Sequence, residues 1–178
     1  QNDGGSNAIL NNVTFTQNTT PGNGGAMQNW TSSPILTDVT FDNNTAGGDG
    51  GAIYNYNTCS PTLNRVKIIN NTAAGSGGGF YNKRKSHPIM TNTLIANNKA
   101  GNNGGGIYNL AKDATGIEPR SPVFTNMTLA GNIAGNSGGG AYDDGFGSSL
   151  LRNSIATGNY ASVVADIDAP LSMVATAL

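Results

Sequence analysis

The chain has 178 residues, of which 37% are hydrophobic and 11% are charged, with one cysteine and a formal net charge of -1 at pH 7. This composition can form one domain, but it lacks the basic excess expected of a protein that binds nucleic acid or an anionic membrane. No apolar stretch approaches the roughly 20 residues of a membrane-spanning helix, and a single cysteine excludes an internal disulfide and a cysteine metal cluster.

Each coil of the predicted structure leads to a marker of the pattern apolar-x-x-Asn, and four of the six coils start with Ser-Pro or His-Pro. Copies of this half-repeat start near Asn7, Ser33, Ser60, His87, Ser121 and Ser148, and their markers are 15–18, 41–44, 68–71, 95–98, 129–132 and 156–159. A second marker, with a double glycine, follows at 24–29, 50–55, 77–82, 104–109 and 138–143. The double-glycine markers start 26, 27, 27 and 34 residues apart, and the extra residues of the long interval lie between Leu110 and Arg120. Such a period indicates a solenoid in which each repeat is one coil.

Each coil holds short apolar runs bounded by Gly, Asn, Ser or Pro, and no window has the apolar spacing of a helix. Such runs are typical of strands joined by tight turns. Three short strands and three turns fill about 26 residues. The sequence therefore predicts an all-β protein, a three-sided parallel β-helix of about six coils of 26–27 residues.

Alternation along the double-glycine strand places one apolar column and one polar column inside the coil. The apolar column is Met27, Ile53, Phe80, Ile107 and Ala141, and the polar column is Asn29, Asn55, Asn82, Asn109 and Asp143. Amides one coil apart, at about 4.8 Å, can hydrogen-bond to one another along a ladder. We therefore expect a structural role for the Asn residues of this column and for those that end the apolar-x-x-Asn marker, which we call the first marker. The double glycine is expected to supply a positive-φ turn without a side chain that would clash with the next coil.

The same alternation turns a column of mostly aromatic residues outward. Gln28, Tyr54, Tyr81, Tyr108 and Tyr142 form this column, which Trp30 and Tyr56 extend, and Lys83, Arg84, Lys85 and the inserted residues 111–120 lie beside it. Stacked aromatic rings suit sugar rings or protein side chains. The candidate ligand-binding residues are therefore Trp30, Tyr54, Tyr56, Tyr81, Lys83, Arg84, Lys85, Tyr108 and Tyr142. The alternative is that the tyrosines only shield the sheet and contribute stacking energy.

Other reactive side chains show no pattern of an active site. The carboxylates build no acidic column over neighbouring coils, and the sole histidine, His87, takes the place of a turn serine before proline. The sequence therefore indicates no catalytic residue, no metal ligand and no cofactor. Cys59 lies beside the Ser60-Pro61 bend and is interpreted as a small, semi-buried filler.

The tail, residues 160–178, contains neither marker but is rich in Val, Ala, Leu and Met. Val163-Val164 and Met173-Val174 are spaced like strands of a further, degenerate coil. We therefore expect one β-helix domain over 1–178, with repeats over 7–159 and a terminal coil or cap over 160–178. Because the chain starts at Gln1 inside a partial coil, it is interpreted as a processed form or a fragment, and the solenoid can continue at either end.

The two interleaved markers, with Gly50-Gly51-Ala52-Ile53 and Phe41-Asp42-Asn43-Asn44 as examples, resemble those of polymorphic outer membrane proteins. More broadly, the chain resembles bacterial right-handed parallel β-helix repeat proteins with pectin-lyase-like folds, from Asn7 to about Asn159. The resemblance implies a right-handed helix and a secreted, cell-surface protein with a structural or adhesive role. Its expected partners are a glycan or a protein of a host or neighbouring cell. The alternative function is a non-catalytic fragment of a polysaccharide lyase or glycoside hydrolase.

Overall fold

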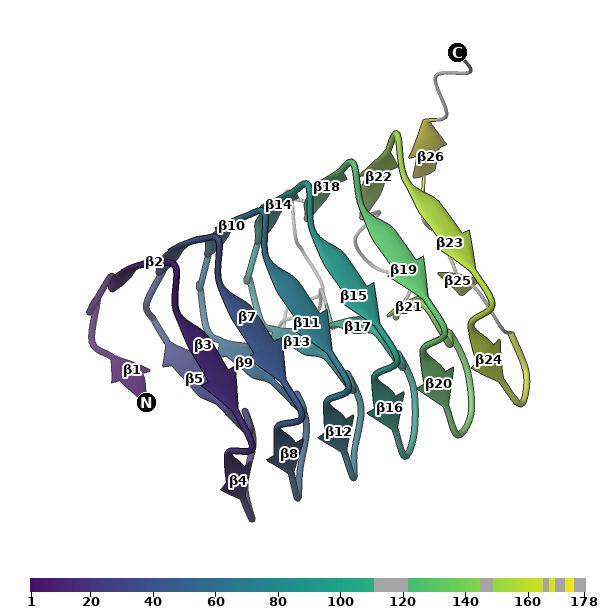
Figure 1. Cartoon of the computed structure of the whole chain (residues 1–178), viewed down its shortest axis with the longest axis horizontal. Helices are drawn as coiled ribbons and strands as arrows, with labels where there is room; N and C mark the ends of the chain where they lie inside the picture. Colours follow the sequence, from purple (N-terminus) through teal and green to yellow (C-terminus); the bar gives the residue numbers. More distant parts are fainter. Residues whose placement is uncertain (111–121, 145–148, 165–166, 169–171, 175–178) are drawn as a thin grey trace.

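The computed structural model describes residues 1–110, 122–144, 149–164, 167–168 and 172–174. These residues form strands and turns, and no helix occurs among them. Parallel strands from successive coils stack side by side into a β-solenoid, as Figure 1 shows. The all-β, parallel solenoid architecture predicted from the repeats is thus confirmed.

Four parallel sheets run along the solenoid. Sheet 1 contains β1 (Asn2–Asp3), β5 (Met27–Trp30), β9 (Ile53–Tyr56), β13 (Phe80–Lys83), β17 (Ile107–Leu110), β21 (Ala141–Asp143) and β25 (Ile167–Asp168). Sheet 2 contains β2 (Ile9–Asn11), β6 (Ile35–Thr37), β10 (Thr62–Asn64), β14 (Ile89–Thr91), β18 (Val123–Thr125), β22 (Leu150–Arg152) and β26 (Ser172–Val174). Sheet 3 contains β3 (Thr14–Thr16), β7 (Thr40–Asp42), β11 (Lys67–Ile69), β15 (Leu94–Ala96), β19 (Thr128–Ala130) and β23 (Ile155–Thr157). Sheet 4 contains β4 (Thr19–Thr20), β8 (Thr45–Ala46), β12 (Thr72–Ala73), β16 (Lys99–Ala100), β20 (Ile133–Ala134) and β24 (Tyr160–Ala161).

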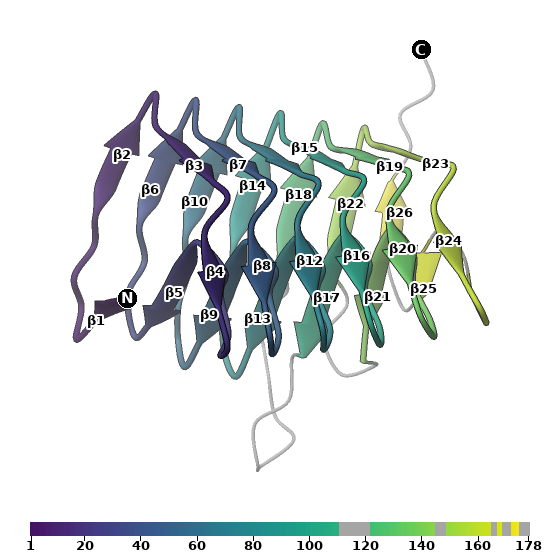
Figure 2. The same ribbon diagram turned by 60° about the horizontal axis from the view of Figure 1, so that its bottom comes forward.

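Sheet 4 corrects the expectation of three strands in each coil. Its strands are only two residues long, and Figure 2 shows them side by side along the solenoid. Two residues are too few to display an alternating pattern, so the sequence does not reveal them as a strand. Their second position is a buried alanine in five successive coils, at Ala46, Ala73, Ala100, Ala134 and Ala161. Five complete coils run from β2 to β21, and β22 to β24 continue the same order.

The core is a narrow column inside the solenoid. The inward residues predicted for sheet 1 (Met27, Ile53, Phe80, Ile107 and Ala141) are all buried. Leu36, Leu63, Met90, Phe124 and Leu151 face them from sheet 2, and Phe41, Ile68, Ile95 and Leu129 from sheet 3. Each large apolar side chain of this column contributes about 1.5–3 kcal/mol by burial.

The turn at the double glycine has the positive φ that the sequence predicted. Gly24, Gly50, Gly77, Gly104 and Gly138 have φ between 65° and 69°. The following glycine lies against the backbone of the next coil at Gly25, Gly51, Gly78 and Gly105, and a Cβ atom on Gly51 would overlap the carbonyl oxygen of Gly78. The two glycines therefore meet two separate requirements, a left-handed turn and a close approach of backbones.

The Asn residues of the first marker form a continuous amide ladder. Each Nδ2 donates to the Oδ1 one coil further on, at 2.8–3.0 Å, along Asn18, Asn44, Asn71, Asn98, Asn132 and Asn159. The second amide proton of Asn71 reaches the carbonyl oxygens of Ile69 and Phe41 at 2.8 and 3.1 Å, and its Oδ1 also accepts the backbone N–H of Asn44. The buried amides are thus satisfied within the coil stack, as expected.

The sheet 1 ladder follows the same pattern up to its last member. Asn29 donates to Asn55, Asn55 to Asn82 and Asn82 to Asn109, at 2.7–2.9 Å. Asn109 then donates to the hydroxyl of Ser149 at 2.9 Å, and that hydroxyl donates to the Asp143 carboxylate at 2.6 Å. Asp143 has no side-chain amide group, so the series of amide donors ends at Asn109.

The tail continues three of the sheets, since β24 at its start pairs with β20 in sheet 4. β25 pairs parallel with β21, and β26 pairs parallel with β22, so Met173-Val174 lie in a strand as expected. Val163 and Val164 do not; they follow β24 as exposed turn residues, because the coil must bend there before sheet 1 resumes at Ile167. The assignment of 1–178 to one domain stays a prediction. The insertion 111–120, with the coil starts at Ser121 and Ser148, lies outside the described residues.

Removing one rung of the ladder tests its contribution. Asn71→Ala is expected to lower the free energy of unfolding by about 1–3 kcal/mol, because the buried donors and acceptors of Asn44, Asn98 and Phe41 lose their partner. Asn64→Ala is the control, because Asn64 lies in β10 and makes only a long, exposed bond of 3.4 Å with Asn92. Urea unfolding of both variants measures the difference. Equal stabilities would contradict a structural role for the ladder.

Candidate ligand-binding surface

Tyr54, Tyr81, Tyr108 and Tyr142, at equivalent positions of sheet 1, form one continuous stack of rings. Centroids are 5.2 Å apart from Tyr54 to Tyr81, 4.8 Å from Tyr81 to Tyr108 and 5.2 Å from Tyr108 to Tyr142, with interplanar angles of 10–20°. The spacing of coils is close to the preferred distance for offset stacking, so each ring covers the face of the next.

This stacking corrects the expectation of an open tyrosine surface. Tyr54 and Tyr81 are each only 4% exposed, and Tyr108 and Tyr142 are half-buried. Alternation correctly places these residues between the inward positions, but it does not show that neighbouring rings bury one another. A ligand therefore cannot reach the ring faces of Tyr54 and Tyr81, and the stack contributes packing energy instead.

Three tyrosines of the stack have a raised pKa. Burial, with a smaller contribution from the negative charge of Asp49, raises the pKa of Tyr54 to about 12. Burial likewise raises the pKa of Tyr81, with Asp49 adding to it, and of Tyr108, with Asp144 adding to it. Desolvation disfavours the phenolate, so these hydroxyls keep their protons.

Solvent-accessible aromatic surface occurs where the sheet 1 strands end. Trp30 is 41% exposed, and its ring lies 4.4 Å from the ring of Tyr56, at an angle of 50°. The guanidinium carbon of Arg84 lies 5.1 Å from the centroid of Tyr56, within cation–π distance. The register pairs Trp30 with Tyr56 and Tyr56 with Lys83. We call the group Trp30, Tyr56, Lys83, Arg84 and Lys85 the aromatic–basic corner.

The backbone of this corner is left-handed at consecutive residues. Arg84 and Lys85 have φ of 51° and 55°, and the preceding coil has Asn57 and Thr58 at 64°. Asn tolerates this conformation, whereas for other side chains it costs on the order of 1 kcal/mol per residue. The corner therefore carries two long cationic side chains at positions where glycine or asparagine would be more stable.

A column of small buried residues fixes the corner from inside. Ser32 donates to the carbonyl oxygen of Trp30 at 3.1 Å, and Ser86 donates to that of Lys83 at 2.8 Å. Between them, the thiol of Cys59 donates to the carbonyl oxygen of Tyr56 at 3.1 Å. Cys59 is fully buried, deeper than the sequence suggested, and burial raises the pKa of its thiol.

The position of Cys59 leads to a prediction about both stability and reactivity. Cys59→Ser is expected to change the unfolding free energy by less than about 1 kcal/mol, because serine makes the same hydrogen bond in the adjacent coils. In the native chain the thiol should react with a thiol-specific reagent only slowly, and at full rate in urea. Rapid labelling of the native protein would contradict this.

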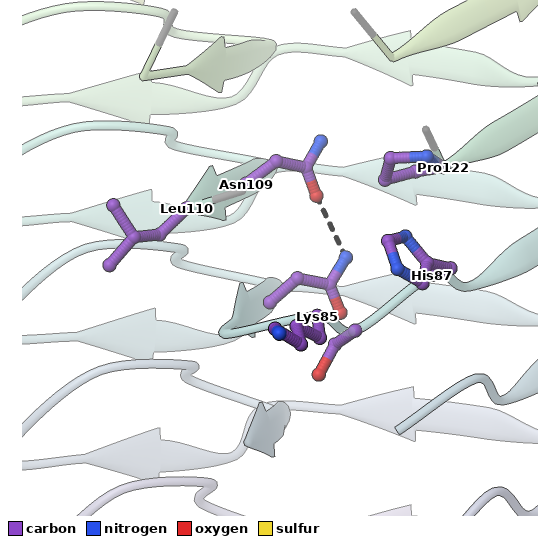
Figure 3. Close-up of a pocket in the computed structure, with 7 residues that line it drawn as sticks. Lys85, His87, Asn109, Leu110 and Pro122 are labelled. Carbon is purple, nitrogen blue, oxygen red and sulfur yellow. Dashed lines mark hydrogen bonds between the residues drawn. The ribbon is translucent and has the colours of Figure 1, made fainter. Parts of the chain in front are cut away.

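A small pocket opens next to the corner, between the end of β13 and the start of β14. It is lined by Asn82, Lys85, Ser86, His87, Asn109, Leu110 and Pro122. Figure 3 shows Lys85 and His87 on one side and Asn109 and Pro122 on the other, with the hydrogen bond from Asn82 to Asn109 between them. His87 lies in the expected turn, where its backbone N–H donates to the carbonyl oxygen of Cys59 at 2.9 Å.

Acidic residues of the described coils have structural partners. Asp38 pairs with Arg65 at 2.7 Å on another corner, Asp42 accepts from Asn70, and Asp49 accepts the backbone N–H of Ser76. Within the described ranges, no group of three His, Cys, Asp or Glu side chains could hold a metal ion. None of the described elements is a helix long and apolar enough to cross a membrane.

The Chlamydia polymorphic membrane protein repeat matches residues 12–26, 38–56, 65–83 and 92–110. The last three matches each run from the corner after sheet 2, through sheets 3 and 4, to the end of a sheet 1 strand. No curated protein and no solved structure matches the chain.

Proposed function

We propose that this chain, a β-solenoid that carries four repeats of the Chlamydia polymorphic membrane protein type, is a cell-surface module that adheres through its aromatic–basic corner. The repeat type suggests a location at the outer membrane or cell surface. The adhesive role is our inference from the surface, and its expected partner is a glycan or protein of a host or neighbouring cell.

The observation that carries the proposal is the contact of Trp30, Tyr56 and Arg84 at the surface. Tryptophan, tyrosine and arginine are the residues most often found at the energetic centres of binding interfaces. Here Tyr56 contacts both Trp30 and Arg84, and the indole of Trp30 remains open to a partner. The buried tyrosine stack supports this cluster but cannot itself offer ring faces.

The corner is also held in place before any partner arrives. The stack contacts it through Tyr54 and Tyr56, whose centroids are 6.4 Å apart, and the backbone is fixed by Ser32, Cys59 and Ser86. A preorganised surface loses less conformational entropy on binding, so more of the contact energy becomes affinity.

Binding of the labelled chain to cultured animal cells, measured by flow cytometry, tests the proposal. Trp30→Ala is expected to lower the apparent affinity by about tenfold or more, as truncation of a central aromatic residue does in other interfaces. Tyr160→Ala is the matched control, because Tyr160 is an exposed aromatic residue in sheet 4. Both variants should keep the wild-type melting temperature within a few degrees. Equal cell binding by the wild type and Trp30→Ala would refute adhesion through this corner.

A further inference from the structure

The aromatic–basic corner has the charge and shape to select one class of partner. We infer that it binds an acidic polysaccharide, with a sugar ring on the indole of Trp30 and a sulfate or carboxylate group at Lys83 and Arg84. The inference rests on the proposed function and specifies the partner of the same surface.

The first observation is the concentration of positive charge. The whole chain has nine Lys and Arg residues, and three of them are consecutive at 83–85. Arg65, in contrast, is paired with Asp38 at 2.7 Å. Lys83 and Arg84 form no ion pair with a carboxylate of the described residues. The planar guanidinium of Arg84 can bind a carboxylate or sulfate through two parallel N–H groups.

The second observation is the backbone strain beneath those charges. Arg84 has a φ of 51°, although the equivalent corner residue of the preceding coil is Asn57, which suits this conformation better. Strained residues that persist despite a simple alternative are found mainly at functional sites. The strain of Arg84 and the absence of an ion pair to it among the described residues are independent observations that lie at the same residue.

The third observation favours a sugar over an acidic peptide. The strands β5, β9 and β13 of the corner are paired on both sides, so no free strand edge is present there for a peptide to extend. An exposed indole instead presents a flat apolar face, which suits the C–H face of a pyranose ring. Lys83 lies one strand beyond Tyr56, so cation and ring occur side by side along the solenoid axis.

Affinity for four probes tests the inference: heparin oligosaccharide, hyaluronan oligosaccharide, dextran and polyglutamate, each at low and physiological salt. We expect heparin or hyaluronan to bind, with affinity falling as salt rises, and dextran and polyglutamate to bind at least tenfold more weakly. Comparison of heparin with hyaluronan distinguishes sulfate from carboxylate recognition. Failure of both acidic glycans, or equal binding of polyglutamate, would overturn the inference.

Arg84→Asn is the decisive variant, because it removes the charge and relieves the strain together. It should lower affinity for the acidic glycan about tenfold while the melting temperature stays equal or rises. Arg65→Asn is the matched control: it removes one cation from another left-handed corner position, with φ of 52°, and should leave the affinity within about twofold. Equal losses in the two variants would mean that only net charge matters, and would overturn the assigned site.

The inference and the proposed function can fail separately. If excess heparin and hyaluronan leave cell binding unchanged while Trp30→Ala abolishes it, the corner adheres to a different partner and the acidic polysaccharide is wrong. If Trp30→Ala leaves cell binding intact, adhesion through the corner is wrong. Glycan binding that survives Trp30→Ala at full strength would overturn the assigned sugar contact.

Discussion

Ile53→Asp is expected to abolish cooperative folding of the chain, or to lower the free energy of unfolding by roughly 4 kcal/mol or more. Ile53 is 1% exposed and packs in the inward column between Met27 and Phe80. A carboxylate at this position would be buried without a cation. The nearest inward polar side chain of the strand, Asn55, already donates to Asn82 and accepts from Asn29. Burial of an unpaired charge is among the largest penalties that a single substitution can impose.

Ile35→Asp provides the matched control for this experiment. Ile35 has the same side chain in a strand of the same solenoid, but it faces outward from sheet 2 and is 45% exposed. Its replacement is expected to change the unfolding free energy by about 0.5 kcal/mol. Thermal melts followed by far-UV circular dichroism measure both variants. Similar melting temperatures would show that the inward and outward faces have been assigned wrongly.

Gly51→Ala is the second substitution with a large expected effect, although it adds only one methyl group. A Cβ atom at Gly51 would overlap the carbonyl oxygen of Gly78 and lie 2.7 Å from the carbonyl carbon of Thr72. Both atoms are backbone and belong to the next coil, so relief requires two coils to separate. Because the strand hydrogen bonds hold the coils in register, we expect a loss of about 3 kcal/mol or more.

Gly22→Ala separates this steric effect from the general preference for alanine over glycine. A Cβ atom there would meet only the Thr20 hydroxyl, at 3.7 Å, and Gly22 has no positive φ. This control is therefore expected to be neutral or slightly stabilising, by up to about 1 kcal/mol. The midpoints of urea unfolding of Gly51→Ala and Gly22→Ala measure the difference in stability. A Gly51→Ala protein as stable as Gly22→Ala would mean that neighbouring coils can move apart freely.

Periodicity alone predicted the solenoid, the inward columns and the amide ladder of the first marker. These features repeat once in each coil, so a wrong register would have broken every copy at once. The alternation that places Ile53 and Asn55 inward follows from the pleat of a single strand, and it is visible in the sequence. The same applies to the left-handed glycine at Gly50, whose turn is local.

Signals that were present in the sequence were nevertheless missed. Asn23, Asp49, Ser76, Asn103 and Ser137 precede the left-handed glycines and form a further ladder, in which the side-chain oxygens of the first four accept a backbone N–H from the next coil. Their common property, a side chain with an oxygen acceptor directly before the glycine pair, could have revealed it. The alanine column of sheet 4 is a similar case, since an alanine occurs two residues after five of the six marker Asn residues, Asn18 being the exception.

The candidate site depended on tertiary structure, because it arises from contacts between coils. The sequence indicated the residues of the site through one aromatic column and one run of basic residues. It did not show that Tyr81 is buried by its neighbours whereas Trp30 remains exposed. The cation–π contact of Arg84 with Tyr56 joins residues of adjacent coils, and the requirement for Gly51 comes from the backbone of Gly78. The sequence by itself thus determined the coil and the direction of each side chain, since both follow from local backbone geometry. Only the stacked coils decided which side chains a partner can reach, because exposure depends on the neighbours that stacking brings within contact distance.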